Sequence, residues 1–184
     1  MSKKALVVFA EGFEDIEAVT PVDILRRAGV AVTVAGINGT DITGSRASLT
    51  IACDTAIEDT DDLYDAIVLP GGMPGAKNLG ESHIVQALVQ TLAGSNKIVA
   101  AICATPAIVL APLGILNNKT ATCYPSMEKA FDQSTTHSTA PVVVDDNIIT
   151  SQGPATALEF SLAIVEALCG TDKRNEIAQA VLSE

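Results

Sequence analysis

The sequence predicts an α/β fold in which a mostly parallel sheet is covered by helices on both faces. Short runs of β-branched residues alternate with longer helical stretches, which is the pattern of parallel strands joined by helices. The strand-like runs are apolar almost throughout, as expected for strands that are buried on both faces. The chain has 184 residues, a length that fits one domain, so we expect a single domain over residues 1–184.

Four buried strands are predicted up to residue 102. The apolar, β-branched runs are short enough to be buried strands; they are residues 5–10, 31–37, 66–69 and 97–102. Two longer stretches, residues 14–28 and 77–92, are predicted helices, and Gly29 follows the first of them where a C-terminal cap is needed. The polar segment 38–56 lies between two strands and is predicted to form a hairpin outside the sheet.

The second half repeats the pattern. A helix is predicted to begin near Pro106, because proline is well tolerated in a first helical turn. The sheet is predicted to be completed by three short segments, residues 121–124, 142–144 and 148–150. Two final helices are predicted over residues 155–168, capped by Gly170, and 175–182.

Charge and composition exclude several classes of partner. The chain carries 22 acidic against 11 basic residues, a net charge of −11, so we expect no specific binding to nucleic acid or to anionic membranes. Residues 98–116 form an uncharged run, but its prolines indicate a buried strand that turns into a helix rather than a membrane span. The N-terminal apolar run is shorter than a signal-peptide core, and the chain is therefore expected to be cytoplasmic.

Cysteine and histidine usage points away from disulfides and metals. The four cysteines are too few and too scattered for a disulfide scaffold in a domain of this size; they are Cys53, Cys103, Cys123 and Cys169. No Cys-x-x-Cys pair occurs, and the only histidines are His83 and His137, so we expect no zinc site. Both histidines lie in polar surroundings and are expected to be solvated.

Cys103 is the strongest candidate for a reactive residue. It directly follows the predicted strand 97–102, where the chain must turn sharply into a helix, and it has small neighbours such as Ala101 and Ala104. This is the arrangement of a nucleophile elbow, whose strained backbone presents the side chain. A helix N-terminus lowers the pKa of an adjacent thiol, so we expect the thiolate to be enriched. The alternative is a buried cysteine that only fills space.

Two neighbouring segments could assist this cysteine. Gly71 and Gly72 end the strand 66–69, where glycine backbone can aim N–H groups at an oxyanion, although a plain tight turn is the alternative. Glu17 has apolar neighbours, and a carboxyl on the sheet-facing side would have a raised pKa and could carry protons. Glu14 and Asp15 can instead complement the helix dipole.

Taken together, these residues resemble the ThiJ/PfpI superfamily, most closely the branch that contains YajL and the parkinsonism-associated protein deglycase. The resemblance covers nearly the whole chain, and its segments are residues 6–8 with Glu14 and Glu17, 21–23 with 26–29, 68–72, 100–104 and 150–154. It implies a flavodoxin-like sandwich that forms a homodimer and works without a cofactor.

The resemblance also implies roles for individual residues. It places the family's reactive cysteine at Cys103 and its protonated carboxyl partner at Glu17. The backbone N–H groups of Gly72 and Ala104 correspond to the family's oxyanion-binding pair, and Gly71 shapes the turn. Further residues match segments near the same pocket: Glu14, Arg46, Gly153 and Pro154.

Three departures from related patterns narrow the activity. Some relatives carry a histidine before a proline near the cysteine, where this chain has Tyr124, and a phenol is no general base near neutral pH. The protease-like branch has a histidine directly after the nucleophile, where Ala104 stands here. The amidotransferases on this fold use a downstream His-x-Glu pair, which His137-Ser138-Thr139 does not supply. Peptidase and amidotransferase activities are therefore set aside.

Two functions are expected from this combination. The first is a deglycase or glyoxalase that uses Cys103 and Glu17 to convert methylglyoxal, glyoxal or their early adducts into 2-hydroxy acids. The second is a redox-responsive protective protein or chaperone in which Cys103 oxidises to sulfenate and sulfinate. The two hypotheses share one site.

Overall fold

A seven-stranded sheet forms the centre of the computed structural model, which describes residues 2–46, 49–61 and 64–183. The strand order is β10-β11-β7-β6-β1-β2-β5. The strands are β1 (Lys4–Phe9), β2 (Ala31–Gly36), β5 (Thr55–Ala56), β6 (Ala66–Leu69), β7 (Ile98–Ile102), β10 (Val142–Asp145) and β11 (Ile148–Ser151). Neighbouring strands run parallel except β10, which is antiparallel to β11. The predicted mostly parallel sheet is confirmed.

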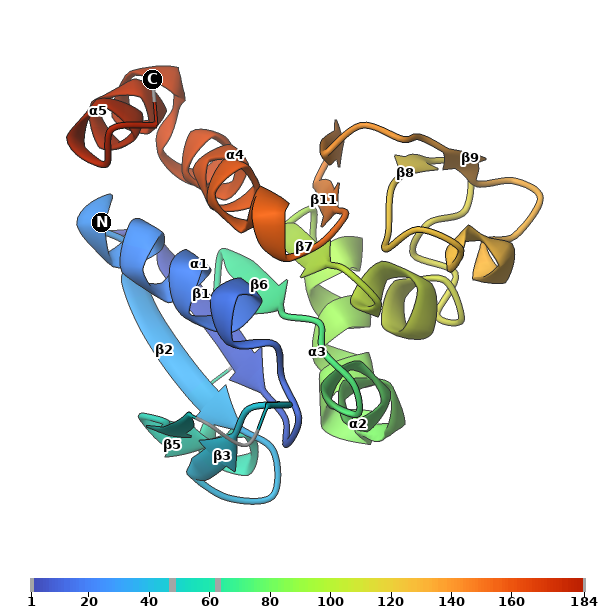
Figure 1. The fold of residues 1–184 in the computed structure, drawn as a ribbon, viewed down its shortest axis with the longest axis horizontal. Coiled ribbons are helices and arrows are strands. Elements are labelled where there is room, and N and C mark those ends of the chain that lie inside the picture. Colours follow the sequence, from blue (N-terminus) through green and yellow to red (C-terminus); the bar gives the residue numbers. More distant parts are fainter. Residues whose placement is uncertain (1, 47–48, 62–63, 184) are drawn as a thin grey trace.

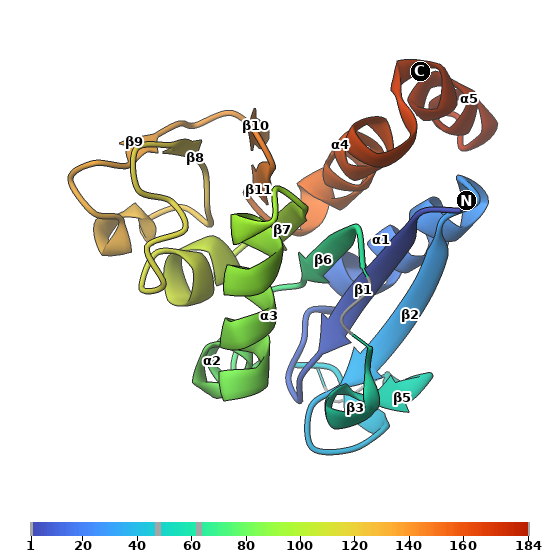
Figure 2. The ribbon, with the colours of Figure 1, turned by 180° about the vertical axis from the view of Figure 1, so that it is seen from behind.

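Helices cover both faces of this sheet because alternate residues of each strand point to opposite sides. The helices are α1 (Asp15–Arg27), α2 (Gly75–Glu81), α3 (His83–Gly94), α4 (Ala157–Cys169) and α5 (Thr171–Ala180). Val7 and Val68 belong to the core beneath α1 and α4, whereas Leu6 belongs to the core beneath α2 and α3. Figure 1 shows α1 and α4 over one face, and Figure 2 shows α3 over the other. The expected flavodoxin-like sandwich is confirmed.

The predicted helix over residues 77–92 is two helices, because Ser82 interrupts it. Ser82 has an extended backbone (φ −79°, ψ 112°), and its hydroxyl accepts a hydrogen bond from the N–H of Val85 at 3.4 Å. A serine that caps a new helix in this way ends the previous one. The last helix also differs from its prediction, since α5 begins at Thr171 rather than at residue 175.

The prediction that residues 121–124 complete the main sheet is wrong. Strand β8 (Thr120–Ala121) pairs with β9 (Thr136–His137) in a separate two-stranded sheet, which lies beyond β10 and β11 in Figure 2. Side chains, rather than backbone hydrogen bonds of a strand pair, connect this segment to β10 and β11. The N–H of Thr120 donates to Asp145 Oδ2 at 2.7 Å, and the N–H of Thr122 donates to Thr150 Oγ1 at 3.0 Å.

The hairpin and the helix caps follow the prediction more closely. Strands β3 (Asp41–Thr43) and β4 (Thr50–Ala52) form an antiparallel pair outside the main sheet, although β5 returns to the sheet before residue 56. Gly29 and Gly170 follow α1 and α4 with positive φ angles of 81° and 89°, as capping requires.

The described residues also include four short helical turns: η1 (Ile57–Asp59), η2 (Pro106–Leu110), η3 (Glu128–Ala130) and η4 (Pro154–Thr156). η2 begins at Pro106 as predicted, but it is a single π-helical turn of five residues. The apolar run 98–116 thus divides into β7, η2 and the turns that follow. Within the described ranges, no helix has both the length and the apolar character needed to cross a membrane.

Candidate active site

The predicted site segments meet at one edge of the sheet, where four parallel strands end. In the strand registers, Leu69 of β6 pairs with Ala101 of β7, and Ile102 of β7 pairs with Ser151 of β11. One further bond, from the N–H of Cys103 to the carbonyl of Ser151 at 2.9 Å, extends the β7–β11 pairing to the cysteine. Cys103 therefore stands at the last position held by the sheet, as ligand sites in open α/β sheets do.

The backbone of Cys103 is strained in the way that a nucleophile elbow requires. Its φ angle is +66°, a left-handed conformation that is uncommon outside glycine, asparagine and aspartate. Two contacts hold the turn in place: the Thr105 hydroxyl donates to the carbonyl of Pro70 at 2.7 Å, and the N–H of Tyr124 donates to the carbonyl of Cys103 at 2.7 Å. Thr105 is thus a positioning residue for the elbow.

Glu17 is the buried carboxyl of the site. It is 0% exposed on α1, and its Oε2 accepts the N–H of Gly71 at 2.9 Å. Burial raises the pKa of Glu17 to about 7; a hydrogen bond with the Cys103 thiol lowers it, and the charge of Glu14 raises it. Beyond that thiol contact, Oε1 has no hydrogen-bond partner among the described residues. The sequence prediction of a desolvated carboxyl with a raised pKa is confirmed.

The expected lowering of the Cys103 pKa is wrong. Burial, together with the charge and hydrogen bond of Glu17, raises the pKa of the thiol to about 12, against the N–H groups of Ala104 and Gly72, which lower it. The cysteine is only 9% exposed, and the helix that follows has five residues, so its dipole is too short to outweigh desolvation.

The two raised pKa values describe one shared proton rather than two independent groups. Above about pH 7 the pair holds a single proton, which lies on sulfur or on the carboxyl at the same net charge. When the proton lies on Glu17, the thiolate is stabilised by the N–H groups of Gly72 and Ala104. The pair can therefore generate a nucleophile by internal proton transfer, without a separate base.

Gly71 allows the carboxyl and the thiol to approach each other. A Cβ atom at this position would lie 2.5 Å from Glu17 Oε2 and 2.6 Å from Cys103 Cβ, closer than real Cβ contacts. Replacing Gly71 by alanine is expected to lower the free energy of unfolding by about 1–3 kcal/mol through overpacking, and to disrupt the pair.

Thermal or urea unfolding measures this effect directly. Gly94→Ala is the matched control, because a Cβ there meets no atom within 4 Å and the residue ends α3. We expect the control to be neutral or slightly stabilising. Equal stability of the Gly71→Ala variant and the native protein would contradict the packing described above.

An open cleft of about 610 Å³ leads to the cysteine. It brings together predicted site residues from four strand ends and from the hairpin side, and its lining is Glu14, Ser45, Arg46, Gly72, Met73, Cys103, Ala104, Tyr124, Pro125, Met127 and Pro154. Gly153 lies just behind the wall, where a Cβ would be 3.5 Å from the Tyr124 ring and 3.9 Å from Glu17 Oε1. Sequence reasoning missed four lining residues that have no chemical signature: Ser45, Met73 and Pro125, which adjoin predicted residues, and Met127, three positions after Tyr124.

The polar groups at the cleft divide into buried and exposed ones. Glu14 is the N-cap of α1, and its carboxylate accepts the N–H of Glu17 at 2.9 Å, so it fixes the turn that carries Glu17. Arg46 and Tyr124 are exposed members of the cleft lining. The cleft therefore offers a cation at its mouth and a thiol, a carboxyl and two N–H donors at its base.

Comparison with known proteins agrees with this architecture. The sequence profile described as the DJ-1/PfpI family matches residues 3–167. The chain is 42% identical to "Protein dj-1beta" of Drosophila melanogaster over 184 residues, covering 99% of this chain and 98% of that protein. The chain belongs to the DJ-1/PfpI family. The resemblance found in the sequence is thereby confirmed.

Two further relatives of this DJ-1/PfpI chain bear on structure and activity. The solved structure "Toxoplasma gondii DJ-1, oxidized" superimposes with a TM-score of 0.94 at 37% identity, covering 98% of both chains. A Caenorhabditis elegans protein named "Glutathione-independent glyoxalase DJR-1.2" is 35% identical over 177 residues, covering 95% of this chain and 94% of that protein. The family and the fold are thus shown, and a member with a named enzymatic activity is among the relatives.

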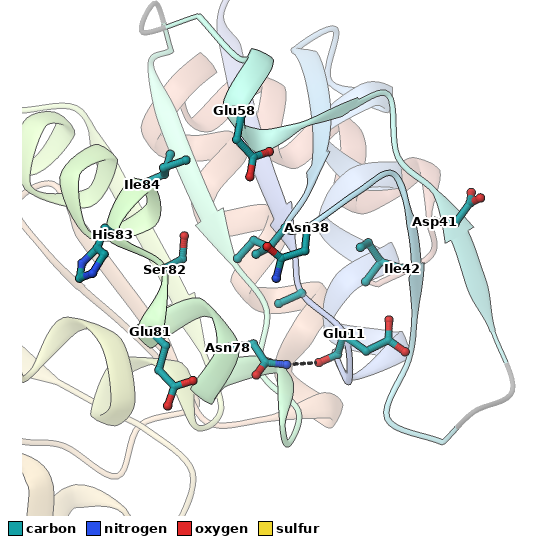
Figure 3. A pocket seen from close by; sticks show the side chains of 12 residues that line it. Glu11, Asn38, Asp41, Ile42, Glu58, Asn78, Glu81, Ser82, His83 and Ile84 are labelled. Carbon is teal, nitrogen blue, oxygen red and sulfur yellow. Dashed lines mark hydrogen bonds between the residues drawn. The ribbon is translucent and has the colours of Figure 1, made fainter.

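A second cleft in this DJ-1/PfpI chain lies beside Glu11 and has a different lining from the cleft at Cys103. It measures about 540 Å³ and is bordered by Glu11, Asn78 and His83, whose arrangement Figure 3 shows. Glu11 Oε2 accepts the N–H of Thr43 at 2.9 Å, and its carbonyl accepts from Asn78 at 2.8 Å. Glu11 thus ties the hairpin to the first strand end, and His83 is exposed as predicted.

The buried carboxyl makes the stability of this DJ-1/PfpI chain depend on pH. Glu17 has its pKa raised from an ordinary value of 4.5 to about 7, so the folded state binds a proton more tightly than the unfolded state. Its contribution is fully present below about pH 4.5 and is lost as the pH rises through 7, a cost of about 3 kcal/mol. We expect the free energy of unfolding of the native protein to fall between pH 5 and 8. The Glu17→Gln variant, which has no titrating carboxyl at this position, should not show this fall. Urea unfolding of both proteins at pH 5 and at pH 8 measures this difference. An equal change in the free energy of unfolding for the two proteins would contradict the prediction.

Proposed function

We propose that this chain converts methylglyoxal, glyoxal or their early protein adducts into 2-hydroxy acids without glutathione. The observation that carries the proposal is the Cys103–Glu17 pair, which holds one proton beneath two N–H donors in an open cleft. The glyoxalase named among the relatives supports the same chemistry. A cleft of about 610 Å³ has room for a small dicarbonyl and also for an adduct on a side chain.

The first step forms a covalent bond to sulfur. Proton transfer from Cys103 to Glu17 gives the thiolate, which attacks the aldehyde carbon of methylglyoxal. The aldehyde oxygen takes the negative charge, then accepts a proton and becomes the hydroxyl of a hemithioacetal. The N–H groups of Gly72 and Ala104 are placed to stabilise the developing oxyanion.

The second step moves hydrogen between the two carbons. Glu17, again a carboxylate, removes the proton from the former aldehyde carbon and passes it to the ketone oxygen, so that an enediol forms. Glu17 then takes the proton of the hydroxyl on the sulfur-bearing carbon and delivers it to the neighbouring carbon, which gives the thioester of 2-hydroxypropanoate. Water then cleaves the thioester, releasing lactate and restoring the thiol, so no external oxidant or reductant is consumed. Glu17 is the proton carrier in each transfer.

The test is the formation of lactate from methylglyoxal by the fully reduced native protein in the absence of glutathione. We expect catalytic turnover whose rate rises as the pH passes through about 7, because the pair must lose the first of its two protons. Stoichiometric loss of methylglyoxal without lactate would show simple trapping by thiols and amines, and would end the proposal.

A second function, a redox-responsive protective protein, has one observation in its favour. The N–H groups of Gly72 and Ala104 and a protonated Glu17 could all donate hydrogen bonds to oxygens added to the sulfur of Cys103. Burial raises the pKa of Cys123 to about 11, which is below that of Cys103. Preferential oxidation of Cys103 must therefore come from these hydrogen-bond donors and from access through the cleft, rather than from a lower thiol pKa.

Intact-mass measurement after mild peroxide, followed by peptide mapping, tests this second function. All four cysteines, which lie in the described part of the chain, are free thiols and compete for the oxidant. Oxygen on Cys103 before any other cysteine supports the redox function. Earlier oxidation of Cys53 or Cys123 would contradict it.

A further inference from the structure

Three potential metal ligands from separate segments meet beside the cleft. The Sγ of Cys123, a carboxylate oxygen of Glu128 and a ring nitrogen of His137 all lie within 4.8 Å of one another. Cys123 follows β8, Glu128 begins η3, and His137 ends β9, so the fold brings them together across a spacing that is unlike a zinc motif. We propose that this triad binds a divalent transition-metal ion of the zinc type.

The chemistry of the triad suits such an ion. A cysteine thiolate, a neutral imidazole and a carboxylate are the three ligand types that zinc takes from proteins, and together they carry two negative charges. Cys123 is only 1% exposed, whereas Glu128 is partly exposed and His137 is exposed. An ion would therefore enter from the histidine side and keep a fourth position open to water.

The distances require only a small adjustment. Ligand atoms around a tetrahedral zinc ion lie about 3.5 Å apart, as follows from metal–ligand bonds of about 2.0–2.3 Å. The present limit of 4.8 Å would have to close by about 1 Å. Cys123 is buried and fixed, but the longer side chains of Glu128 and His137 can rotate at the surface. The movement needs no change in the backbone.

Backbone contacts already hold the segments that carry His137 and Glu128 in place. His137 pairs with Ala121 across the β8–β9 ladder, and the N–H of Ser138 donates to the carbonyl of Ala121 at 2.9 Å. The N–H of Phe131 donates to the carbonyl of Glu128 at 2.9 Å, and the Phe131 ring meets the His137 ring edge-on with centroids 6.0 Å apart. The site is thus largely built before any ion arrives.

The triad also frames one wall of the active-site cleft. Residues 124–127 lie between two of its ligands, and Tyr124 and Met127 line the cleft. The N–H of Tyr124 holds the carbonyl of Cys103. A bound ion would join the two ends of this wall without using Cys103 or Glu17, so the metal site stands independently of the proposed dicarbonyl chemistry.

Titration of the reduced, tag-free protein with cobalt(II) chloride tests the site. We expect a near-ultraviolet thiolate-to-cobalt absorption band that saturates at one equivalent and disappears when zinc chloride is added. Cys123→Ser and His137→Gln should each weaken cobalt binding roughly tenfold or more, since even outer-shell changes cost 10–100-fold. Cys103→Ser and His83→Gln are the matched controls and should bind cobalt as the native protein does.

Using both Cys123→Ser and His137→Gln keeps the test decisive if one variant fails to fold. His137 is exposed, so its replacement leaves the core intact even if the buried Cys123→Ser variant fails to fold. A band that is absent from the native protein would overturn the proposal. Cobalt binding by His137→Gln that is as tight as in the native protein, or loss of the band in Cys103→Ser, would overturn it as well.

Discussion

Replacing Cys103 by serine is expected to lower the rate of lactate formation from methylglyoxal by roughly a thousandfold or more. Serine keeps the shape of the side chain, but its hydroxyl is far less acidic than the thiol and cannot be ionised by transfer of a proton to Glu17. The N–H groups of Gly72 and Ala104 remain in the variant and cannot replace the lost nucleophile. Lactate measured enzymatically over time gives the comparison.

The control for this substitution is Cys169→Ser. Cys169 is exposed at the end of α4, far along the chain from the cleft residues, and we expect its loss to leave turnover unchanged. A folded Cys103→Ser variant that forms lactate at the native rate would exclude Cys103 as the nucleophile.

Replacing Glu17 by glutamine is expected to lower the turnover rate and, at the same time, to raise the reactivity of the Cys103 thiol. Turnover should fall by about 10²–10⁴, the usual contribution of a positioned acid–base group, because the hydrogen can no longer move between the two carbons. The thiol should become more reactive at the same time. Both the charge of Glu17 and its hydrogen bond raise the pKa of Cys103, so their removal lowers that pKa and increases the thiolate fraction.

The second half of this prediction is measured by the rate of alkylation of Cys103 with iodoacetamide at neutral pH. Glu159→Gln, an exposed substitution on α4, is the matched control and should change neither rate. Slower alkylation in Glu17→Gln than in the native protein would mean that losing the proton acceptor outweighs the lowering of the Cys103 pKa, and would contradict this prediction.

The sequence predicted the parts of the site that depend on strand ends. Cys103, Gly71 and Gly72 follow buried apolar runs, and parallel strands carry their carboxyl ends to one edge, so their meeting follows from the fold class. Glu17 was predicted from its apolar neighbours. The family resemblance was needed to pair it with Cys103, because the packing angle of α1 on the sheet is a tertiary property that local pattern does not contain.

The predictions that the structure contradicts also depend on tertiary contacts. Ser82 ends a helix because its hydroxyl caps the next one, although the apolar periodicity continues through it. The segment after Thr120 leaves the main sheet because side chains such as Asp145 capture its N–H groups. The direction of the Cys103 pKa depends on how deeply the thiol is buried beside Glu17, and neither burial nor that contact can be read from residue spacing.

The most direct test of the shared-proton mechanism is intact-mass analysis, with peptide mapping, of protein quenched during reaction with methylglyoxal. Glu17→Gln can form the hemithioacetal but cannot complete the hydrogen transfer. We therefore expect this variant to accumulate one methylglyoxal unit on Cys103, while the native protein turns over. Absence of the Cys103 adduct from Glu17→Gln, or an equal adduct in Cys103→Ser located on Arg46 or a lysine, would contradict the mechanism.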